Sequence, residues 1–269
     1  SYFYAINPTE VLVNITRQVN VLIMYICMAI LLYNMKQKIF FISWVITLIL
    51  GIEIYAVLDQ AIGMINSSGV INSGELKGVT ANRNITAFSI AIKIPFVLYL
   101  IHDLNKIKYK ALLCFLIFLA LFSLSMIQSR ASFIALGFIF IGYVALNLYI
   151  YFFAKKELSK ILSIGYFVLP LILAVILNQA IIANKGADAI SRAATISFNT
   201  SDGSVDQRLR YYEDVFKQVS SDPLLWVGLG NWKLKSIEYD NRDINGYIVP
   251  YHAHSDFIQL GAELGLIGF

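Results

Sequence analysis

The chain has 269 residues, of which 58% are hydrophobic and only 14% are charged. Soluble domains carry about 25% charged residues, and a mean hydropathy of +0.68 is typical of a membrane protein. The formal charge of +4 would suit a nucleic-acid partner in a soluble protein, but here the lysines form short blocks between apolar runs. The composition therefore argues against a nucleic-acid partner and indicates a chain whose main partner is the lipid bilayer.

A helix that crosses a bilayer takes about 20 mostly apolar residues, and six stretches qualify with varying clarity, the first of them without a sharp start around Arg17. They lie at residues 19–33, 39–58, 85–101, 111–127, 131–153 and 161–182, and a further one starts at 257–269. Because the chain begins at Ser1 without a methionine and ends inside an apolar stretch, we expect a fragment of a longer protein. We predict an all-α fold, a polytopic bundle of transmembrane helices that forms a single membrane domain over residues 1–269.

Lysines distinguish the two sides of the membrane. The short loops after the first, third and fifth spans carry Lys36 and Lys38, then Lys106, Lys108 and Lys110, and then Lys155, Lys156 and Lys160. The positive-inside rule makes these loops cytoplasmic. The other connections then face outward, and the longest of them, residues 183–254, is predicted to be a helical periplasmic loop.

This long outer segment has the pattern of a helix after Ser204. Residues Ser204 to Gln207 have the form of a capping box, and apolar residues then recur at helical spacing. These apolar residues are Val205, Leu209, Tyr212, Phe216 and Val219. The dipeptide Asp222-Pro223 is expected to end the helix. A turn at 228–230 and a short helix at 232–239 are expected to follow.

Three arginines are candidates for contact with a substrate. At about 100° per residue, Arg208 falls at the edge of the apolar stripe and Arg210 on the opposite face. We expect Arg208 to point toward the outer ends of the membrane helices and Arg210 to be solvated. Arg130 stands at the tip of a hairpin between two uncharged spans. For Arg208 and Arg130 alike, a snorkelling side chain at the membrane surface is the alternative.

Lys93 lies in the middle of the third span, two residues before Pro95. An unpaired ammonium at that depth is costly. Lys93 is therefore expected to face a polar cavity, with Glu53 of the second span as its partner. The sequence leaves open whether this pair is structural or part of a site.

Two histidines precede the last apolar run. His252 and His254 would share a face if extended, but no acidic or cysteine partner stands at usable spacing, so no metal site is expected. Ser255 is a good N-cap and Asp256 suits a first helical turn. His254 then lies at a helix N-terminus, whose positive end disfavours the imidazolium. A neutral imidazole can hold a sugar hydroxyl or accept its proton, although a plain surface role is the alternative.

Three motifs occur in an order that resembles the superfamily of O-antigen ligases and polymerases of the bacterial envelope. They are Ser129-Arg130 in MIQSRASFIAL, Arg208 in SVDQRLRYYEDVFKQVSSDPLLWVGLGNW and His254 in YHAHSDFIQLGAELGLIGF. The stretch KGVTANRNITAFSIAIKIP, which contains Asn84, is similar to the outer loop of that family where it enters a span. One departure is Ser255, where many members have Asn.

The resemblance implies a C-type glycosyltransferase fold in the bacterial inner membrane, with the active site facing the periplasm. It implies a glycan donor on undecaprenyl diphosphate and neither a cofactor nor a catalytic metal. The acceptor of a ligase is a lipid A–core sugar, and that of a polymerase is another lipid-linked repeat. We expect a ligase, with a polymerase as the alternative. A protein of another class, a transporter or glycan flippase with Lys93 and Glu53 lining its path, is a further alternative. Such proteins consist of two repeated halves, which the sequence does not show.

The resemblance also assigns roles to residues. Arg130 and Arg208 are expected to neutralise the diphosphate, because the guanidinium fork suits phosphate. His254 is expected to orient or deprotonate the acceptor hydroxyl. Glu263 matches the family's Glu-x-Gly and is expected either to be structural or to position a neighbouring site residue. The expected substrate-binding residues are Arg130, Arg208, Asn84, Lys93 and His252.

Overall fold

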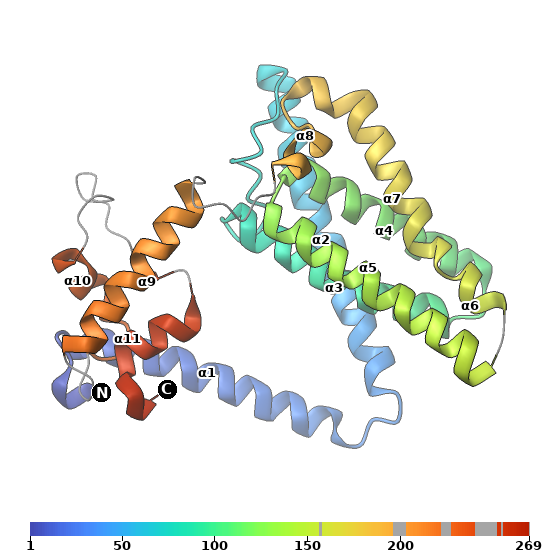
Figure 1. The fold of residues 1–269 in the computed structure, drawn as a ribbon. Helices are drawn as coiled ribbons and strands as arrows, with labels where there is room; N and C mark the ends of the chain where they lie inside the picture. Colours follow the sequence, from blue (N-terminus) through green and yellow to red (C-terminus); the bar gives the residue numbers. More distant parts are fainter. Residues whose placement is uncertain (156–157, 196–202, 222–226, 240–251, 254, 269) are drawn as a thin grey trace. The chain divides into compact units, whose positions relative to one another are not determined.

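The computed structural model describes residues 1–155, 158–195, 203–221, 227–239, 252–253 and 255–268. The chain divides into two compact units (Figure 1). One, here called the bundle unit, is Lys36–Ile196, and the other, here called the α9 unit, combines Ser1–Met35 with Ser197–Phe269. No strand occurs in the described part of the chain, so the predicted all-α class is confirmed.

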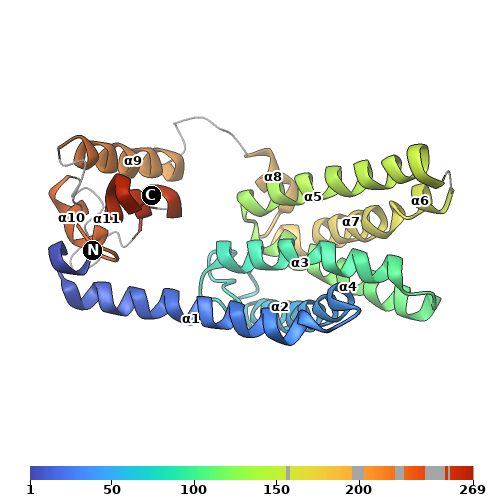
Figure 2. The same cartoon turned by 90° about the horizontal axis from the view of Figure 1, so that it is seen from below.

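The bundle unit consists of long helices joined by short connections. They are α2 (Lys38–Ser68), α3 (Arg83–Asp103), α4 (Ile107–Ile127), α5 (Arg130–Tyr149), η2 (Ile150–Lys155), α6 (Leu158–Leu162), α7 (Gly165–Leu177), η3 (Asn178–Ile182), η4 (Ala183–Lys185) and α8 (Ala189–Ala194). α3 lies between α2, α4 and α5, and α7 packs on α4 (Figure 2). Side chains such as Leu50, Ile94 and Ile117, which are fully buried, fill the centre.

Six described helices are long and apolar enough to cross a membrane. They are α1 (Pro8–Tyr33), α2, α3, α4, Arg130–Phe153 and Leu158–Lys185. This is the architecture of a polytopic helical membrane protein. Several helices are longer than the apolar stretches that predict them. α1 begins at Pro8, because Asn7 caps it by accepting a hydrogen bond from the Thr9 N–H and because proline suits the first helical position.

The α9 unit holds the rest of the chain. Its helices are α1, η1 (Tyr2–Tyr4), α9 (Gly203–Ser221), α10 (Trp232–Lys235), η5 (Ser236–Glu238) and α11 (Asp256–Gly268). α9 ends before Asp222-Pro223 and a short helix begins at Trp232, as predicted, whereas α9 begins at Gly203, one residue before the expected cap. A small core of Val215, Trp232, Ala253 and Ala262 joins α9, α10 and α11.

Candidate functional site

The predicted site residues are distributed over both units. Arg130, Asn84 and Lys93 belong to the bundle unit, and Arg208, His252 and His254 belong to the α9 unit. His254 lies outside the described residues. A joint action of Arg130 with Arg208 and His254 therefore stays a prediction.

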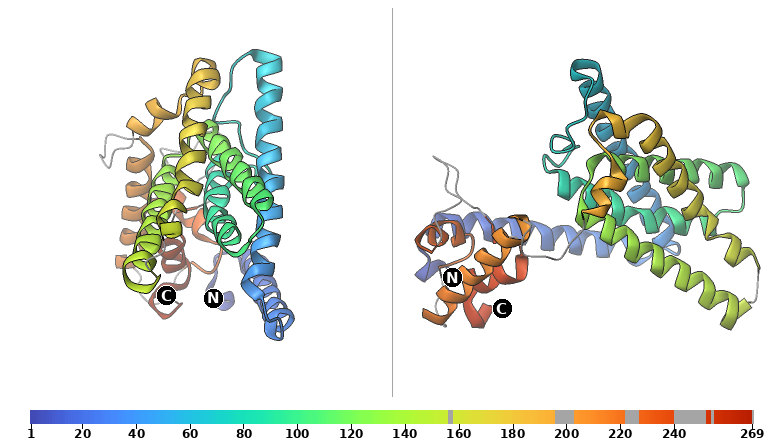
Figure 3. Two further views of the ribbon diagram at one scale, coloured as in Figure 1. Left: turned by 90° about the vertical axis from the view of Figure 1, so that its right-hand side faces the viewer. Right: turned by 45° about the horizontal axis from the view of Figure 1, so that its top comes forward.

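α3 and α5 begin at the same end of the bundle unit, beside α8 (Figure 2). α4 ends at Ile127, and Gln128 adopts a left-handed conformation that reverses the chain, so that α5 starts at Arg130. The loop after α2 lies against the end of η4 (Figure 3), where the Ile71 N–H donates to the Lys185 carbonyl at 2.6 Å. This end of the bundle thus gathers the connections that the sequence predicts to face outward.

Three arginines from different helices lie at this end, namely Arg83 in α3, Arg130 in α5 and Arg192 in α8, and all three are half-buried. The Nε of Arg192 donates a hydrogen bond to the Gln128 carbonyl at 3.2 Å, which ties α8 to the turn just before Arg130. Burial first, and then the positive charges of Arg130 and Arg83, lower the pKa of Arg192. The guanidinium group of Arg192 is therefore close enough to those of Arg130 and Arg83 to be repelled by both. We call them the arginine cluster.

Two members of the arginine cluster, Arg83 and Arg192, lack an acidic partner in the described part of the chain. Asp188, which caps α8, is occupied elsewhere: hydrogen bonds from Ser191 and Gln179 lower its pKa to about 2. Positive charges such as those of Arg83 and Arg192, to which the described residues supply no carboxylate, favour an anionic ligand, and guanidinium groups bind phosphate in a bidentate manner.

The sequence did not identify Arg83 or Arg192 as candidate site residues. Arg192 lies in a long outer segment, where Arg and Lys say nothing about topology, and Arg83 directly follows the α3 cap. A local signal for α8 does exist, because Asp188 accepts hydrogen bonds from the N–H groups of Ile190 and Ser191 as a typical N-cap. Recognising that cap would have placed Arg192 on a helix, but not beside Arg130.

Lys93 is paired with Glu53, as predicted. Its Nζ lies 2.8 and 2.9 Å from the two carboxylate oxygens, and both side chains are buried, with 13% and 6% exposed. The Ser89 hydroxyl and carbonyl complete the hydrogen bonds of the ammonium. The fold therefore neutralises this charge itself, which favours a structural role. Asn84, in contrast, is exposed in the first turn of α3.

The predicted orientation of the α9 arginines is wrong for Arg210 within its own unit. The Arg210 side chain is only 15% exposed, and its Nε lies 3.5 Å from Asp206 Oδ2, whereas Arg208 is exposed. The face that packs in this unit carries Tyr211 and Val215, while Phe216 of the apolar stripe is 62% exposed. The other buried residues of this face are Asp214 and Gln218. The helix packs through a partly polar face because Gln218 donates to the Ala262 carbonyl.

Glu263 organises the segment around the histidines. One carboxylate oxygen accepts from the Gly230 N–H at 2.7 Å, and the other accepts from Gln259 at 3.0 Å. Gln259 in turn accepts from the Ala253 N–H at 3.3 Å, and His252 Nδ1 lies 3.3 Å from the same amide oxygen. Glu263 thus links the 228–230 turn to the segment that leads into α11, in agreement with the structural role predicted for it.

The start of α11 agrees with the predicted cap. The helix begins at Asp256, and the Gln259 N–H donates to the Ser255 carbonyl at 2.9 Å. The 228–230 turn also forms, with Gly228 and Gly230 at φ of 90° and 78°, values that favour glycine. No group of three His, Cys, Asp or Glu side chains that could hold a metal ion occurs among the described residues.

Comparison with known proteins adds to this geometry. The sequence model of a family described as O-antigen ligase matches residues 115–269, which is more than half of the chain. The match includes Arg130, Arg192, Arg208 and the segment before α11. Neither a curated protein nor a solved structure matches the chain. On the strength of the match over residues 115–269, the chain belongs to the O-antigen ligase family.

Proposed function

We propose that this chain is a ligase-type glycosyltransferase that moves a glycan from undecaprenyl diphosphate to an acceptor sugar hydroxyl, that of lipid A–core. Membership of the O-antigen ligase family supports a lipid-linked glycan as the substrate. The arginine cluster supports a diphosphate as the group that is bound, since Arg83 and Arg192 have no acidic partner among the described residues.

The reaction requires neutralisation of a leaving group. The acceptor oxygen attacks the anomeric carbon of the donor glycan, and the bond from that carbon to the diphosphate oxygen breaks. The bonding electron pair stays with the lipid diphosphate, so negative charge develops there. Arg130 and Arg208 stabilise this charge by bidentate hydrogen bonds. His254 accepts the proton of the acceptor hydroxyl, for which a neutral imidazole is suited.

The reaction takes place at the periplasmic face of the bacterial inner membrane. The lysine-rich loops point to the cytoplasmic side, and the arginine cluster belongs to the opposite end of the bundle, where α4 turns into α5. A glycan that has been moved outward on its lipid carrier would therefore meet the arginines directly.

Complementation tests this proposal. The full-length gene is expressed in a cell that lacks its ligase, with Arg208→Ala or His254→Ala introduced and membrane expression checked. Each change is expected to abolish glycan attachment to lipid A–core. Wild-type attachment by an expressed variant would remove that residue from the mechanism. Arg210→Ala is the control, because its side chain already pairs with Asp206.

Gel analysis of the glycan separates a ligase from a polymerase. Loss of a ligase leaves long glycan chains that are not attached to the core. Loss of a polymerase leaves single repeats on the core. The first pattern supports the proposal, and the second assigns the chain to polymerisation instead.

A further inference from the structure

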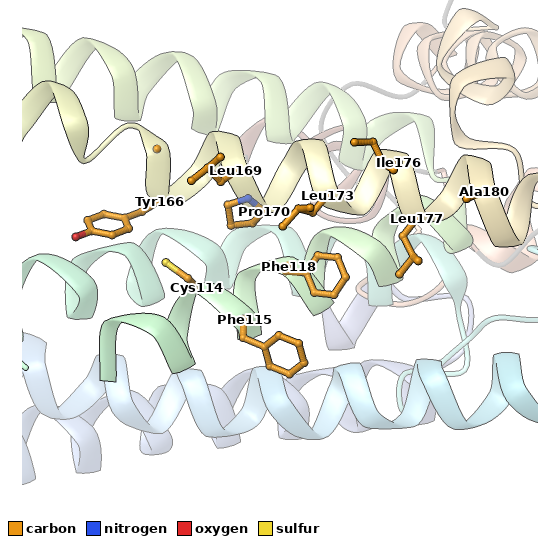
Figure 4. A pocket seen from close by; sticks show the side chains of 11 residues that line it. Cys114, Phe115, Phe118, Tyr166, Leu169, Pro170, Leu173, Ile176, Leu177 and Ala180 are labelled. Carbon is orange, nitrogen blue, oxygen red and sulfur yellow. The ribbon is translucent and has the colours of Figure 1, made fainter. Parts of the chain in front are cut away.

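Two apolar grooves of the bundle unit differ in whether charged side chains line them. The first, between α4 and α7, has a volume of about 560 Å³ and is lined by side chains such as Phe118, Pro170 and Leu177 (Figure 4). Arg, Lys, His, Asp and Glu do not occur in the described lining of this groove. It offers lipid tails an apolar surface without a charged group.

The second groove, here called the α3–α5 groove, combines an apolar wall with a basic end. Its volume is about 450 Å³, and its walls come from α3 and α5, with η2 and α6 also contributing. The apolar part of the lining, which suits a hydrocarbon chain, includes Leu98, Tyr99, Phe138, Ile139 and Leu146. His102 and Lys160 line the end at which α3 and α5 stop. The lysine-rich loops predict that this end faces the cytoplasm.

Most polar groups at the basic end of the α3–α5 groove are already occupied. The Tyr143 hydroxyl donates to the Ser163 carbonyl at 2.8 Å, so it accepts from Nε2 of His102 at 2.9 Å. The Asn147 amide donates to the Tyr143 carbonyl at 2.8 Å. These bonds tie α3 and α5 to the turn between α6 and α7. The end of the groove therefore has a fixed shape that needs no ligand to form.

Two lysines at this end are not neutralised by the described part of the chain. Lys160, which lines the groove, has neither an ion pair nor a hydrogen bond to its ammonium among the described residues. Lys110 lies nearby: its Nζ is 5.9 Å from the centre of the Tyr166 ring, and that ring meets the His102 ring edge-on at 6.4 Å. Positive charge therefore collects where the apolar groove ends.

We propose that the α3–α5 groove binds an anionic glycerophospholipid of the cytoplasmic leaflet. One acyl chain lies along Tyr99, Phe138 and Leu146, and the phosphate lies at Lys160 and Lys110. The site is at the opposite end of the bundle unit from the arginine cluster. It does not take part in glycan transfer, so it stands or falls independently of the proposed function.

Charge complementarity selects an anionic lipid over the other occupants of such a groove. An ammonium is a compact point charge that suits a single phosphate, and basic pockets between membrane helices on the cytoplasmic side bind anionic head groups. A zwitterionic head group brings a cation of its own, which the two lysines would repel. A soluble phosphate would contact the lysines but would leave the apolar wall of the groove uncovered.

Lipid binding to the full-length protein, measured by native mass spectrometry at physiological ionic strength, tests the head-group site. The probes are phosphatidylglycerol and phosphatidylcholine with the same acyl chains. Lys160→Gln is expected to weaken phosphatidylglycerol binding by about tenfold, the effect of losing one charge-assisted hydrogen bond, and to leave phosphatidylcholine binding unchanged. Lys106→Gln is the control, because it removes the same charge from an exposed position outside the groove. Screening should limit its effect to about twofold.

A pair of glycine variants tests the apolar wall. A Cβ added at Gly142 or at Gly137, both in α5, has no atom within 4 Å, so neither position resists a larger side chain. Gly142 lines the α3–α5 groove and Gly137 does not. Gly142→Leu is expected to remove most phosphatidylglycerol binding, and Gly137→Leu to leave it unchanged. Equal effects of the two variants would overturn the path assigned to the acyl chain.

The remaining outcomes decide the head group. Stronger binding of phosphatidylglycerol than of phosphatidylcholine, reduced in Lys160→Gln and kept in Lys106→Gln, supports the proposal. Equal binding of the two lipids by the wild type, or equal losses in the two lysine variants, would overturn it. Inorganic phosphate that competes with phosphatidylglycerol at equal concentration would make this a site for a soluble anion and would overturn the lipid as its ligand.

Discussion

The bundle unit holds its positive charges in two contrasting ways. Lys93 lies in the middle of α3 with Glu53 and Ser89 around its ammonium, so its charge is balanced by the protein. Arg83 and Arg192 lie at one end of the same bundle, and no described carboxylate pairs with either of them. The two regions contain the same kind of charge but differ in what neutralises it.

This difference suggests how to separate structural from functional cations in a membrane protein. A charge at membrane depth that the fold has already paired contributes to folding, because removing one partner leaves the other exposed to a low dielectric. Positive charges that repel one another lower the stability of the folded protein unless an anion binds to them. Arginines held in this second way are therefore candidates for binding an anionic ligand.

The largest expected effect concerns the paired lysine. Lys93→Met leaves the Glu53 carboxylate buried without its partner and should cost about 3–5 kcal/mol of stability. The double variant with Glu53→Met removes both charges and should recover most of that loss. Thermal unfolding in detergent measures both. If Lys93→Met were as stable as the wild type, Lys93 would have no structural role as the partner of Glu53. The contrast between Lys93 and the arginines at the end of the bundle would then fail.

Arg130 should have the next largest effect, on the reaction and not on the fold. Losing one preorganised contact to the leaving group typically raises the barrier by about 3 kcal/mol. Arg130→Ala is therefore expected to slow glycan transfer by about a hundredfold with little change in the unfolding temperature. Transfer kinetics with purified protein, run beside an unfolding curve, check this. A large loss of stability with an unchanged rate would place Arg130 with Lys93 in the structural group.

Glu263 extends the comparison to a buried anion. Glu263→Ala leaves the Gly230 N–H and the Gln259 amide without their acceptor, at a cost of about 1–3 kcal/mol. We expect a lower unfolding temperature and a loosened 252–255 segment. Amide hydrogen exchange should show faster exchange at Gly230 and Ala253. Unchanged protection at both amides would show that the carboxylate does not organise this segment.

Arg210 should give the smallest effect. Its contact with Asp206 is a long i,i+4 pair whose carboxylate is largely exposed, and such pairs contribute at most about 0.5 kcal/mol. Arg210→Ala should therefore leave both transfer and stability close to wild type. A loss of transfer as large as that of Arg208→Ala would instead place Arg210 in contact with the substrate.

Charges inside apolar spans were the easiest features to predict. An unpaired ammonium is costly at membrane depth, so Lys93 was predicted to pair with a carboxylate. Glu53 is the acidic residue of the predicted neighbouring span. The start of α11 after Ser255 and the end of α9 before Asp222-Pro223 were also predictable, because both signals are local, whereas α9 begins one residue before the cap expected at Ser204. The Gln128 turn followed from the short polar interval between two apolar runs.

The packing of α9 and the arginine cluster could not be predicted in the same way. The apolar stripe through Leu209 and Phe216 did not identify the face of α9 that packs in its unit, because that face is partly polar and is held by the hydrogen bond from Gln218 to the Ala262 carbonyl. The proximity of Arg83 and Arg192 depends on how α3, α5 and α8 meet. These residues are far apart in the chain, and no local pattern connects them.

Reconstitution of the purified full-length protein in liposomes tests the central claim most directly. A glycan on undecaprenyl diphosphate is supplied with the acceptor, and consumption of donor is followed together with its passage across the bilayer. The proposed function predicts that each glycan transferred releases one undecaprenyl diphosphate. Passage of intact donor to the other side, with none consumed, would contradict it and would make the chain a transporter.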